Sequence, residues 1–203
     1  MTNSKKRDQI RELIFNTNGY DSESRQKRII QLIPEFEMMY HLEHNQVAHA
    51  YDVFEHTLKV VDDMPNGDEL GRLAALFHDI GKPIKRFYGI DGVCHYWGHA
   101  ELSSIMANEI LSRLGYPCDI INAVTIMCLY HDNYLDKSYE EFKIVAGAMG
   151  YGNVITFCNL QRADLYAHAK EYYDKHKKGL EESHMRLEYF MKRVVEENLF
   201  NPD

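Results

Sequence analysis

The sequence predicts an all-α protein, on three observations. Apolar residues recur at spacings of three and four, no stretch alternates with the period of two typical of a strand, and Gly and Pro signals divide the pattern into helix-sized segments. The chain has 203 residues, which suffices for one sizeable core, and no Ser/Pro/Gly-rich linker divides it. We therefore expect one domain, built from helices.

Two helices and a loop are expected before residue 51. The first helix buries Ile10, Leu13 and Ile14 and ends at Asn18-Gly19. The second helix starts after Ser22 or Ser24 as N-cap and stops near Pro34. The segment from 35 to 50 has no clean period, so we interpret it as an irregular loop that leads to the functional site.

The next two helices carry the most informative residues. Asp52 is expected to cap a helix in which Glu55 completes a capping box. After a turn at 65–67, a helix beginning at Asp68 or Glu69 has a broad apolar face and should be nearly all buried. Its last turn holds His78-Asp79, and the following Gly81 and Pro83 are stop signals.

The remainder of the chain predicts a loop and five helices. Gly89 and Gly92 mark the loop, which leads to His95 and His99. The expected helices run to a stop at 115–117, from Asp119 to His131, from Tyr139 to Met149, from about Asn153 to a lysine-rich break at 177–179, and from Leu180 to Leu199.

Composition narrows the function classes. The net charge of −8 argues against a protein that mainly holds nucleic-acid backbone. The four cysteines, Cys94, Cys118, Cys128 and Cys158, show no C-x-x-C pairing, so neither a disulfide framework nor a zinc knuckle is expected. The N-terminus lacks the apolar region of a signal peptide, and there is no run of about 18 apolar residues. We expect a cytoplasmic protein without a membrane partner.

Histidine and aspartate residues form a candidate metal site. Neutral imidazole and carboxylate are both good ligands for divalent transition metals. Six such residues lie at or near helix ends or in helices expected to pack together: His56, His78, Asp79, His99, His131 and Asp164. A single histidine is more often a surface or core residue than a ligand, but the joint pattern favours ligands.

The order H, HD, H, H, D resembles that of the HD-domain metal-dependent phosphohydrolases, from about Tyr51 to His168. Within this superfamily the sequence is similar to the HD domain of the bacterial tRNA nucleotidyltransferases, the CCA-adding enzymes. The matching segments are 51–58, 74–82, 98–100, 130–132 and 160–168. The Gly-Ser dipeptide and paired aspartates of the nucleotidyltransferase head are missing. We therefore expect a free-standing hydrolytic domain that does not add CCA.

The resemblance implies a compact helical bundle of the HD-domain type, a single domain over 1–203 with its core at about 51–170 and the terminal helices packed on it. It implies that His56, His78, Asp79 and Asp164 hold one ion, and that Asp79 bridges to a second ion on His99 and His131, as in two-metal members. The ion is Mn, Ni, Fe, Co, Zn or Mg, since the sequence does not identify it. Single-metal members keep other residues at the positions of His99 and His131, so the number of ions stays open.

Two basic residues are expected to bind substrate phosphate. Lys82 should act as a point charge and Arg162 as a fork. Of the other histidines, His95 either shares a face with His99 or lies on the surface, and His41 and His44 are expected to be solvated. His49 and His168 are expected to support the ligands or to face the substrate.

Two further patterns have structural explanations. Gly115-Tyr116-Pro117 matches the name of the cyclic-di-GMP phosphodiesterase branch, but a helix stop explains it. The lysines at 170, 175, 177 and 178 alternate with acidic residues and predict a solvated helix face rather than an RNA surface.

The expected function is hydrolysis of a phosphomonoester or phosphodiester of a nucleotide or nucleotide-like substrate by metal-activated water. One alternative is a dinucleoside polyphosphate hydrolase of the two-metal type, and another is a non-catalytic module that binds a nucleotide or an RNA end. The net charge does not favour an RNA partner. The guanosine tetraphosphate hydrolases carry Glu-Asp where this chain has 83–86, and the dNTP triphosphohydrolases usually have histidine at Lys82.

Overall fold

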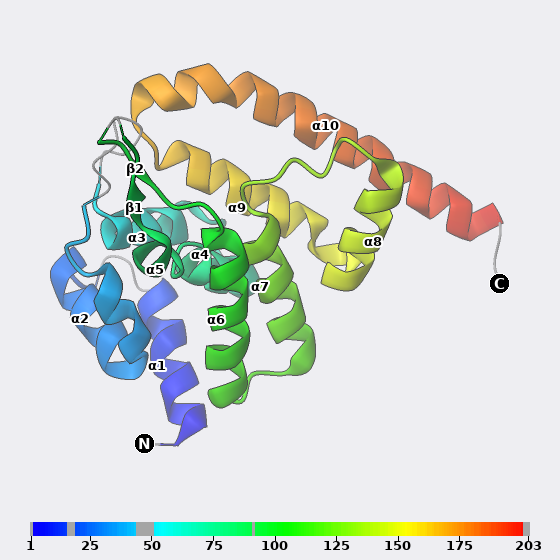
Figure 1. Cartoon of the computed structure of the whole chain (residues 1–203). Coiled ribbons are helices and arrows are strands. Elements are labelled where there is room, and N and C mark those ends of the chain that lie inside the picture. The colour runs from blue at the N-terminus through cyan, green and yellow to red at the C-terminus, as the bar shows by residue number, and fades with distance from the viewer. Residues whose placement is uncertain (1, 16–18, 44–50, 91, 201–203) are drawn as a thin grey trace.

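The computed structural model describes residues 2–15, 19–43, 51–90 and 92–200, and shows a bundle of helices with one small hairpin (Figure 1). The N-terminal part contains α1 (Asn3–Phe15), α2 (Ser22–Leu32), the 3-10 helix η1 (Pro34–Met39), α3 (Val53–Asp63), α4 (Glu69–Phe77) and α5 (Lys82–Lys85). After the hairpin come α6 (His99–Arg113), α7 (Cys118–Tyr130), α8 (Tyr139–Met149), the 3-10 helix η2 (Tyr151–Asn153), α9 (Val154–Tyr166) and α10 (Lys170–Phe200). The predicted all-α class is confirmed.

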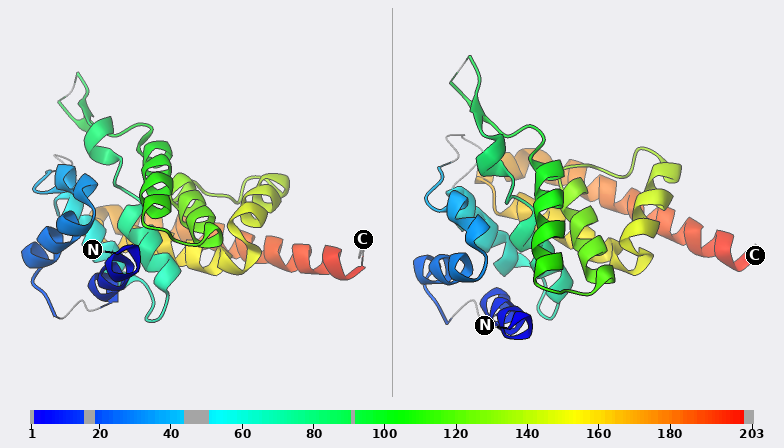
Figure 2. Two further views of the ribbon diagram at one scale, coloured as in Figure 1. Left: turned by 90° about the horizontal axis from the view of Figure 1, so that it is seen from below. Right: turned by 60° about the horizontal axis from the view of Figure 1, so that its bottom comes forward.

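The hairpin is an addition to the predicted elements. Strands β1 (Phe87–Tyr88) and β2 (Cys94–His95) pair antiparallel, with Phe87 opposite His95 and Tyr88 opposite Cys94. The two turned views show it extending from the body beside α5 (Figure 2). Strands of two residues are too short to produce an alternating pattern, which is why the sequence indicated only a loop.

Helix α4 lies at the centre of the bundle. Every residue from Gly71 to Phe77 is buried, and α4 packs against α1, α3, α6, α7 and α9. A helix without an exposed face has to be enclosed by other elements. The C-terminal end of α4 therefore delivers the next two residues, His78 and Asp79, to the interior, where both are 0% exposed.

Caps define the starts of the helices around the site. The carboxylate of Asp52 accepts the Glu55 amide at 2.7 Å, which confirms the predicted N-cap, and Asp68 caps α4 by accepting the Gly71 amide at 2.8 Å. The N-cap of α2 is Asp21 rather than Ser22 or Ser24. Asp21 accepts both the amide and the hydroxyl of Ser24, so the serine orients the capping carboxylate.

The expected break at 177–179 is wrong. Helix α9 ends at Tyr166, and α10 is continuous for 31 residues through Gly179. An exposed glycine costs a helix only about 1 kcal/mol, and the buried residues Leu180, Leu187 and Val194 recur every seven positions along α10, which packs on α8 and α9. That packing outweighs the local signal.

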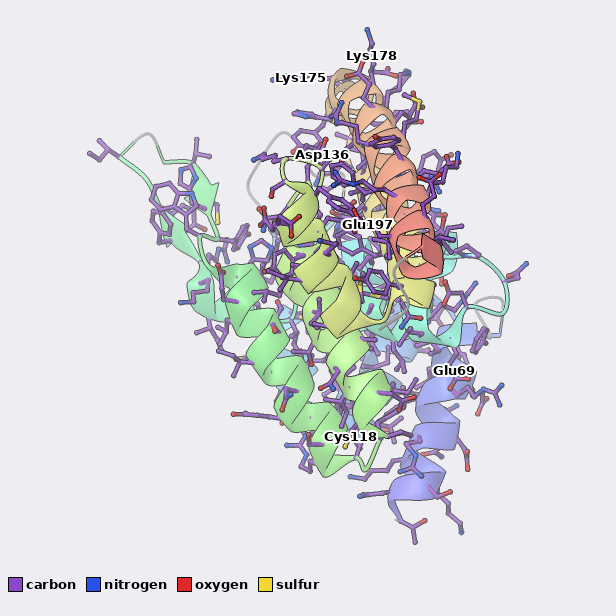
Figure 3. The ribbon with its side chains drawn as sticks, turned by 90° about the vertical axis from the view of Figure 1, so that its right-hand side faces the viewer. Glu69, Cys118, Asp136, Lys175, Lys178 and Glu197 are labelled. Carbon is purple, nitrogen blue, oxygen red and sulfur yellow. The ribbon has the colours of Figure 1, made fainter. Side chains whose placement is uncertain are left out.

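The lysines of α10 form a solvated face, as predicted. Lys170 and Lys177 both pair with Asp174, at 2.5 and 2.7 Å, and Lys178 is 86% exposed. Figure 3 shows Lys175 and Lys178 pointing outward at one end of α10, far from Glu197 near the other. Among the described helices, none is long and apolar enough to cross a membrane.

The loop expected over 35–50 is only partly described. Its first part is η1, which buries Phe36 and Met39, and Phe36 stacks on Phe54 of α3 with ring centroids 5.5 Å apart. Residues 44–50, including His44 and His49, lie outside the described residues, as does Asn18.

Candidate metal centre

The structure brings all six predicted ligands into one cluster. Their positions follow from helix ends and one helix face: His56 in α3, His78 and Asp79 after α4, His99 as the first residue of α6, His131 directly after α7, and Asp164 in α9. The side chains of these residues are between 0% and 13% exposed. Elements that are distant in sequence thus meet around the end of α4.

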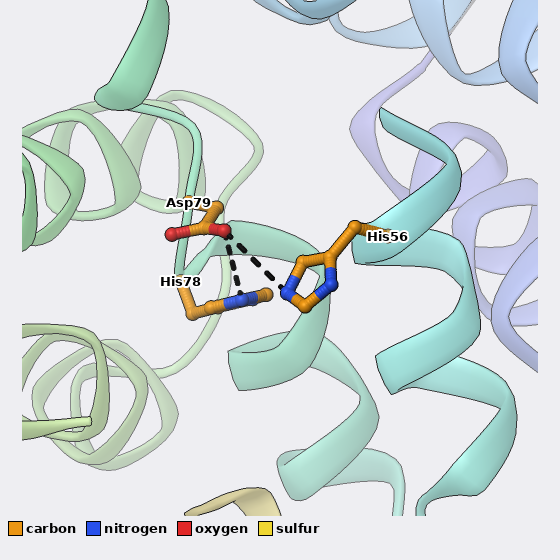
Figure 4. A group of neighbouring side chains, drawn as sticks. All are labelled: His56, His78 and Asp79. Atoms are coloured by element: carbon orange, nitrogen blue, oxygen red, sulfur yellow. Dashed lines mark ion pairs between the residues drawn. The ribbon is translucent and has the colours of Figure 1, made fainter. Parts of the chain in front are cut away.

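Four of the residues surround one point. His56 Nε2 is 2.9 Å from Asp164 Oδ1 and 3.8 Å from Asp79 Oδ2. His78 Nε2 is 3.2 Å from the same Asp79 oxygen and 3.6 Å from Asp164 Oδ1. Figure 4 shows the imidazoles of His56 and His78 approaching that oxygen from two helices. We call these four residues the inner set.

A second group shares Asp79 through its other oxygen. Asp79 Oδ1 is 3.2 Å from His99 Nε2 and 3.7 Å from His131 Nε2, and the two histidine nitrogens are 3.2 Å apart. We call Asp79, His99 and His131 the outer set. The carboxylate of Asp79 therefore faces both sets, one oxygen to each.

The separations match the edges of a coordination polyhedron. Ligand atoms about 2.0–2.2 Å from an ion in tetrahedral geometry lie about 3.3–3.6 Å from one another, and cis ligands of an octahedron about 2.9–3.0 Å. The measured separations run from 2.9 to 3.8 Å. Each set is therefore of the right size and chemical composition to hold one divalent ion.

Hydrogen bonds orient the histidines toward the cluster. Nδ1 of His78 lies 2.7 Å from the Ala75 carbonyl, and Nδ1 of His131 lies 2.7 Å from the Cys128 carbonyl. His99 repeats the arrangement with Tyr96 at 3.0 Å. A carbonyl only accepts, so each Nδ1 carries the hydrogen and each Nε2 is directed into the cluster, which is the arrangement usual for metal-binding imidazole.

Two buried atoms at the centre have no hydrogen-bond partner in the described chain, namely His78 Nε2 and Asp79 Oδ1. An unsatisfied buried polar group costs about 1–3 kcal/mol. Both atoms belong to the proposed ligand sets, and a bound ion would satisfy both. The residues present therefore fit a divalent metal.

The charges of the cluster also favour a cation. Burial raises the pKa of Asp79, but His78 and Lys82 outweigh it and hold that pKa well below its usual value. Burial raises the pKa of Asp164, but the neighbouring imidazoles of His56 and His78 outweigh it and hold that pKa well below its usual value. Burial lowers the pKa of His78, yet Asp79 and Asp164 raise it to about 10. Two buried carboxylates thus stay ionised and attract positive charge.

Lys82, which the sequence predicted to bind substrate phosphate, is buried and paired with Asp79. Its side chain is 9% exposed and its Nζ lies 2.6 Å from Asp79 Oδ2. Burial lowers the pKa of Lys82, but Asp79, Asp164 and Asp132 outweigh it and raise the pKa. Lys82 therefore remains charged and holds the carboxylate that the two sets share.

Two glycines allow α6 to present His99. A Cβ on Gly81 would lie 2.6 Å from the His99 carbonyl and 2.8 Å from the Ser103 amide, so only glycine permits this approach. Gly81 has φ −81°, so its role is closeness rather than the positive φ of a helix C-cap. Gly98, directly before the helix, has φ 78°, a value that favours glycine.

The structure does not bring Arg162 to the cluster. Its side chain is exposed, donates to Asn159 Oδ1 at 2.8 Å and lines an apolar groove between α9 and α10 together with His184 and Met185. Residues two apart on a helix point to different faces, so Arg162 and Asp164 cannot serve the same site. The sequence motif contains both but does not show this.

Three further histidines, for which expectations were drawn from the sequence, lie in different surroundings. His168 lies beside the inner set, close enough to form a ligand group with His56 and Asp164, and its Nδ1 donates to the Asp164 carbonyl at 2.8 Å. His95 is in the hairpin and stacks on Phe87, away from His99. The side chain of His41 is 68% exposed, as expected.

One residue of the site was missed. Asp132 Oδ2 is 3.3 Å from His99 Nε2, and Asp132 Oδ1 is 3.5 Å from His131 Nε2. It also lines a pocket beside the cluster with His131, Asp164 and Tyr172. The available signal was its position directly after His131 in the matching segment 130–132.

Comparison with known proteins agrees with this arrangement. The family model described as "HD domain" matches residues 47–148. The chain is 33% identical over 116 residues to the CC-adding tRNA nucleotidyltransferase of Thermus thermophilus, a match that covers 55% of this chain and 26% of the relative. It is 33% identical over 87 residues to the A-adding tRNA nucleotidyltransferase of Deinococcus radiodurans, covering 39% of this chain and 20% of the relative. The matches thus span about a quarter or less of the relatives' length.

Proposed function

Because this chain belongs to the HD domain family, we propose that it is a metal-dependent phosphohydrolase that cleaves a phosphomonoester or phosphodiester of a nucleotide or nucleotide-like substrate. One observation carries the proposal. The two oxygens of the Asp79 carboxylate face two different groups of ligands, with His78 Nε2 3.2 Å from Oδ2 and His99 Nε2 3.2 Å from Oδ1. A carboxylate shared in this way is suited to hold two ions side by side.

In the proposed reaction, a bound ion and the protein side chains have different roles. A divalent ion in such a site supplies Lewis-acid polarisation of phosphate oxygen and activation of water at neutral pH. The inner set would hold the ion through two imidazoles and two carboxylates. Lys82 keeps Asp79 ionised and in place, and it brings a positive charge to the cluster. The pocket lined by Asp132, Tyr134 and Tyr172 adjoins the ligands His131 and Asp164 and gives a substrate access to them.

Dinucleoside polyphosphates are a second candidate substrate class. The specific support is the outer set, because two ions can bind adjacent phosphates of a polyphosphate chain. An RNA end is a third possibility, since the two relatives are named as enzymes that act on tRNA. The net charge of −8 weighs against a long RNA contact, so a short terminal segment is the form in which RNA would fit.

A purified, metal-free sample reloaded with Mn²⁺, Co²⁺, Ni²⁺ or Mg²⁺ tests the proposal. We expect metal-dependent release of phosphate or nucleotide from at least one member of a panel of phosphomonoesters, cyclic nucleotides, dinucleoside polyphosphates and short RNA oligonucleotides. Tight nucleotide binding without turnover under all four metals would instead support the non-catalytic binding module.

A further inference from the structure

Asp132 lies at the open side of the cluster. It is the second residue after α7, directly beyond His131, and its side chain is 52% exposed. Within the described residues it forms no ion pair with Lys or Arg, and its neighbours are His99 and His131. An exposed carboxylate normally gains little from an ion pair, so its placement against two buried histidine nitrogens needs a reason.

We propose that Asp132 is the fourth ligand of a second, exchangeable metal position formed with the outer set, Asp79, His99 and His131. The inference rests on the proposed metal-dependent function and adds a residue to it. It also distinguishes the two positions, one enclosed in the protein and one bordering solvent.

The distances bring four donor groups close together. Four donor groups have six pairwise separations, and five are known. Asp79 is 3.2 Å from His99 and 3.7 Å from His131, and the two histidines are 3.2 Å apart. Asp132 turns one oxygen to each histidine, with Oδ2 3.3 Å from His99 Nε2 and Oδ1 3.5 Å from His131 Nε2. All five lie near the edge of about 3.3–3.6 Å expected for four ligands about 2.0–2.2 Å from an ion.

Hydrogen positions favour a cation among these groups. Since Nδ1 of His99 and Nδ1 of His131 donate to the carbonyls of Tyr96 and Cys128, both Nε2 atoms of the neutral rings present lone pairs. Carboxylate oxygens of Asp79 and Asp132 face the same space. Four acceptors at these separations repel one another unless a metal ion or a shared proton lies among them.

The inner and outer metal positions differ in how far their ligand side chains are exposed to solvent. The side chains of His56 and His78 are 1% and 0% exposed, whereas His99 is 12% and Asp132 is 52% exposed. The four inner ligands are at most 13% exposed, so an ion among them would be more fully enclosed by the protein. An ion in the outer position can leave when the single exposed carboxylate swings away. We therefore expect one ion that is retained on purification and one that exchanges with the buffer.

A Mn²⁺ titration of the metal-free full-length chain tests the assignment. Calorimetry and metal analysis after gel filtration should show two sites in the wild type, one tight and one weaker. The two ions should also give the exchange-coupled electron paramagnetic resonance spectrum of a Mn pair. In Asp132→Asn we expect the weaker site to lose about 10-fold or more in affinity, the coupled spectrum to disappear at the same Mn²⁺ concentration, and the tight site to remain.

Two further variants control the experiment. Asp119→Asn removes an exposed carboxylate at the other end of α7 and should bind both ions as the wild type does. Asp132→Glu keeps a carboxylate and should recover part of the affinity, which loss of structure alone would not allow. Thermal unfolding of each metal-free variant checks that the fold is retained.

The outcomes separate this inference from the hydrolase proposal, because the titration counts ions and not turnover. A wild type that binds one ion, or an Asp132→Asn variant that binds two ions with unchanged affinities, overturns the role of Asp132. In the first case the outer groups share a proton. If two ions bind as expected but no phosphoester is hydrolysed, the assignment of Asp132 stands and the proposed hydrolysis fails.

Discussion

Lys82 donates a hydrogen bond of 2.6 Å to Asp79 Oδ2, the oxygen that also faces His56 and His78. The lysine that sequence motifs assigned to substrate phosphate is thus bound to the residue at the centre of the metal cluster. Its ammonium group balances charge inside the protein, and this has a consequence for stability.

Replacing Lys82 should destabilise the metal-free protein more than the metal-loaded one. Lys82→Met leaves buried Asp79 without its charged partner, and breaking a buried ion pair costs about 3–5 kcal/mol. Urea unfolding with and without Mn²⁺ measures the effect. Lys85→Met, on the same short helix but exposed, is the matched control and should change the free energy of unfolding by less than about 0.5 kcal/mol. Equal losses in the two variants would contradict the buried pairing.

Removing the Asp79 carboxylate should abolish the proposed hydrolysis. Asp79→Asn keeps the shape but not the charge, and we expect kcat/KM to fall by at least about 100-fold, together with loss of bound metal. His78→Ala should act similarly, since its Nε2 belongs to the inner set. His41→Ala, at an exposed side chain outside the cluster, should leave kcat/KM unchanged. Full activity in Asp79→Asn would exclude the mechanism.

Two glycine-to-alanine substitutions should change the stability of the protein in opposite directions. In Gly81→Ala the new methyl group would meet the His99 carbonyl at 2.6 Å, and overpacking of this kind costs about 1–3 kcal/mol. Metal binding at the outer set should weaken as His99 moves. In Gly179→Ala nothing lies within 4 Å of the new Cβ, and the helical position should become more stable by about 0.4–1 kcal/mol. Thermal unfolding compares the two, and a stabilised Gly81→Ala would be inconsistent with the close approach.

The free energy of unfolding should decrease as the pH is lowered, because His184 is buried in its neutral form. Burial lowers the pKa of this histidine from 6.5 to about 4, so as pH falls below 6.5 the unfolded chain takes up the proton first. The stabilisation is therefore complete above pH 6.5 and is lost progressively toward pH 4. His184→Gln should show a shallower decrease in unfolding free energy between pH 7 and 5, while His41→Gln should follow the wild type. An unchanged slope in His184→Gln would show that His184 does not carry the effect.

Arg162 provides a test between the sequence expectation and the observed placement. Because its side chain lies on another face of α9 from Asp164, Arg162→Ala should leave KM and kcat within about twofold of the wild type. A large rise in KM would mean that Arg162 reaches the substrate in a conformation that differs from this one. The phosphate-binding role would then stand as the sequence motif suggested.

Local sequence signals explain why most helix boundaries could be predicted. The start of α3 at Asp52 and the end of α6 at Gly115 depend on caps a few residues long, and both were predictable. The continuous α10 was not, because Gly179 is locally a helix breaker and only the contacts of Leu180 and Leu187 with the body overcome it. The hairpin after α5 was missed because its strands are too short to show a period.

The sequence by itself determined the all-α class and the six residues offered to a metal, since periodicity and the order of the histidines and aspartates are written along the chain. Tertiary structure decided the rest. The packing around α4 sets which oxygen of Asp79 faces which histidine, turns Lys82 inward, directs Arg162 to another face and places Asp132 beside His99 and His131. These relations depend on the relative positions of helix ends to within about 1 Å, and such positions follow from close packing of the core rather than from any local pattern.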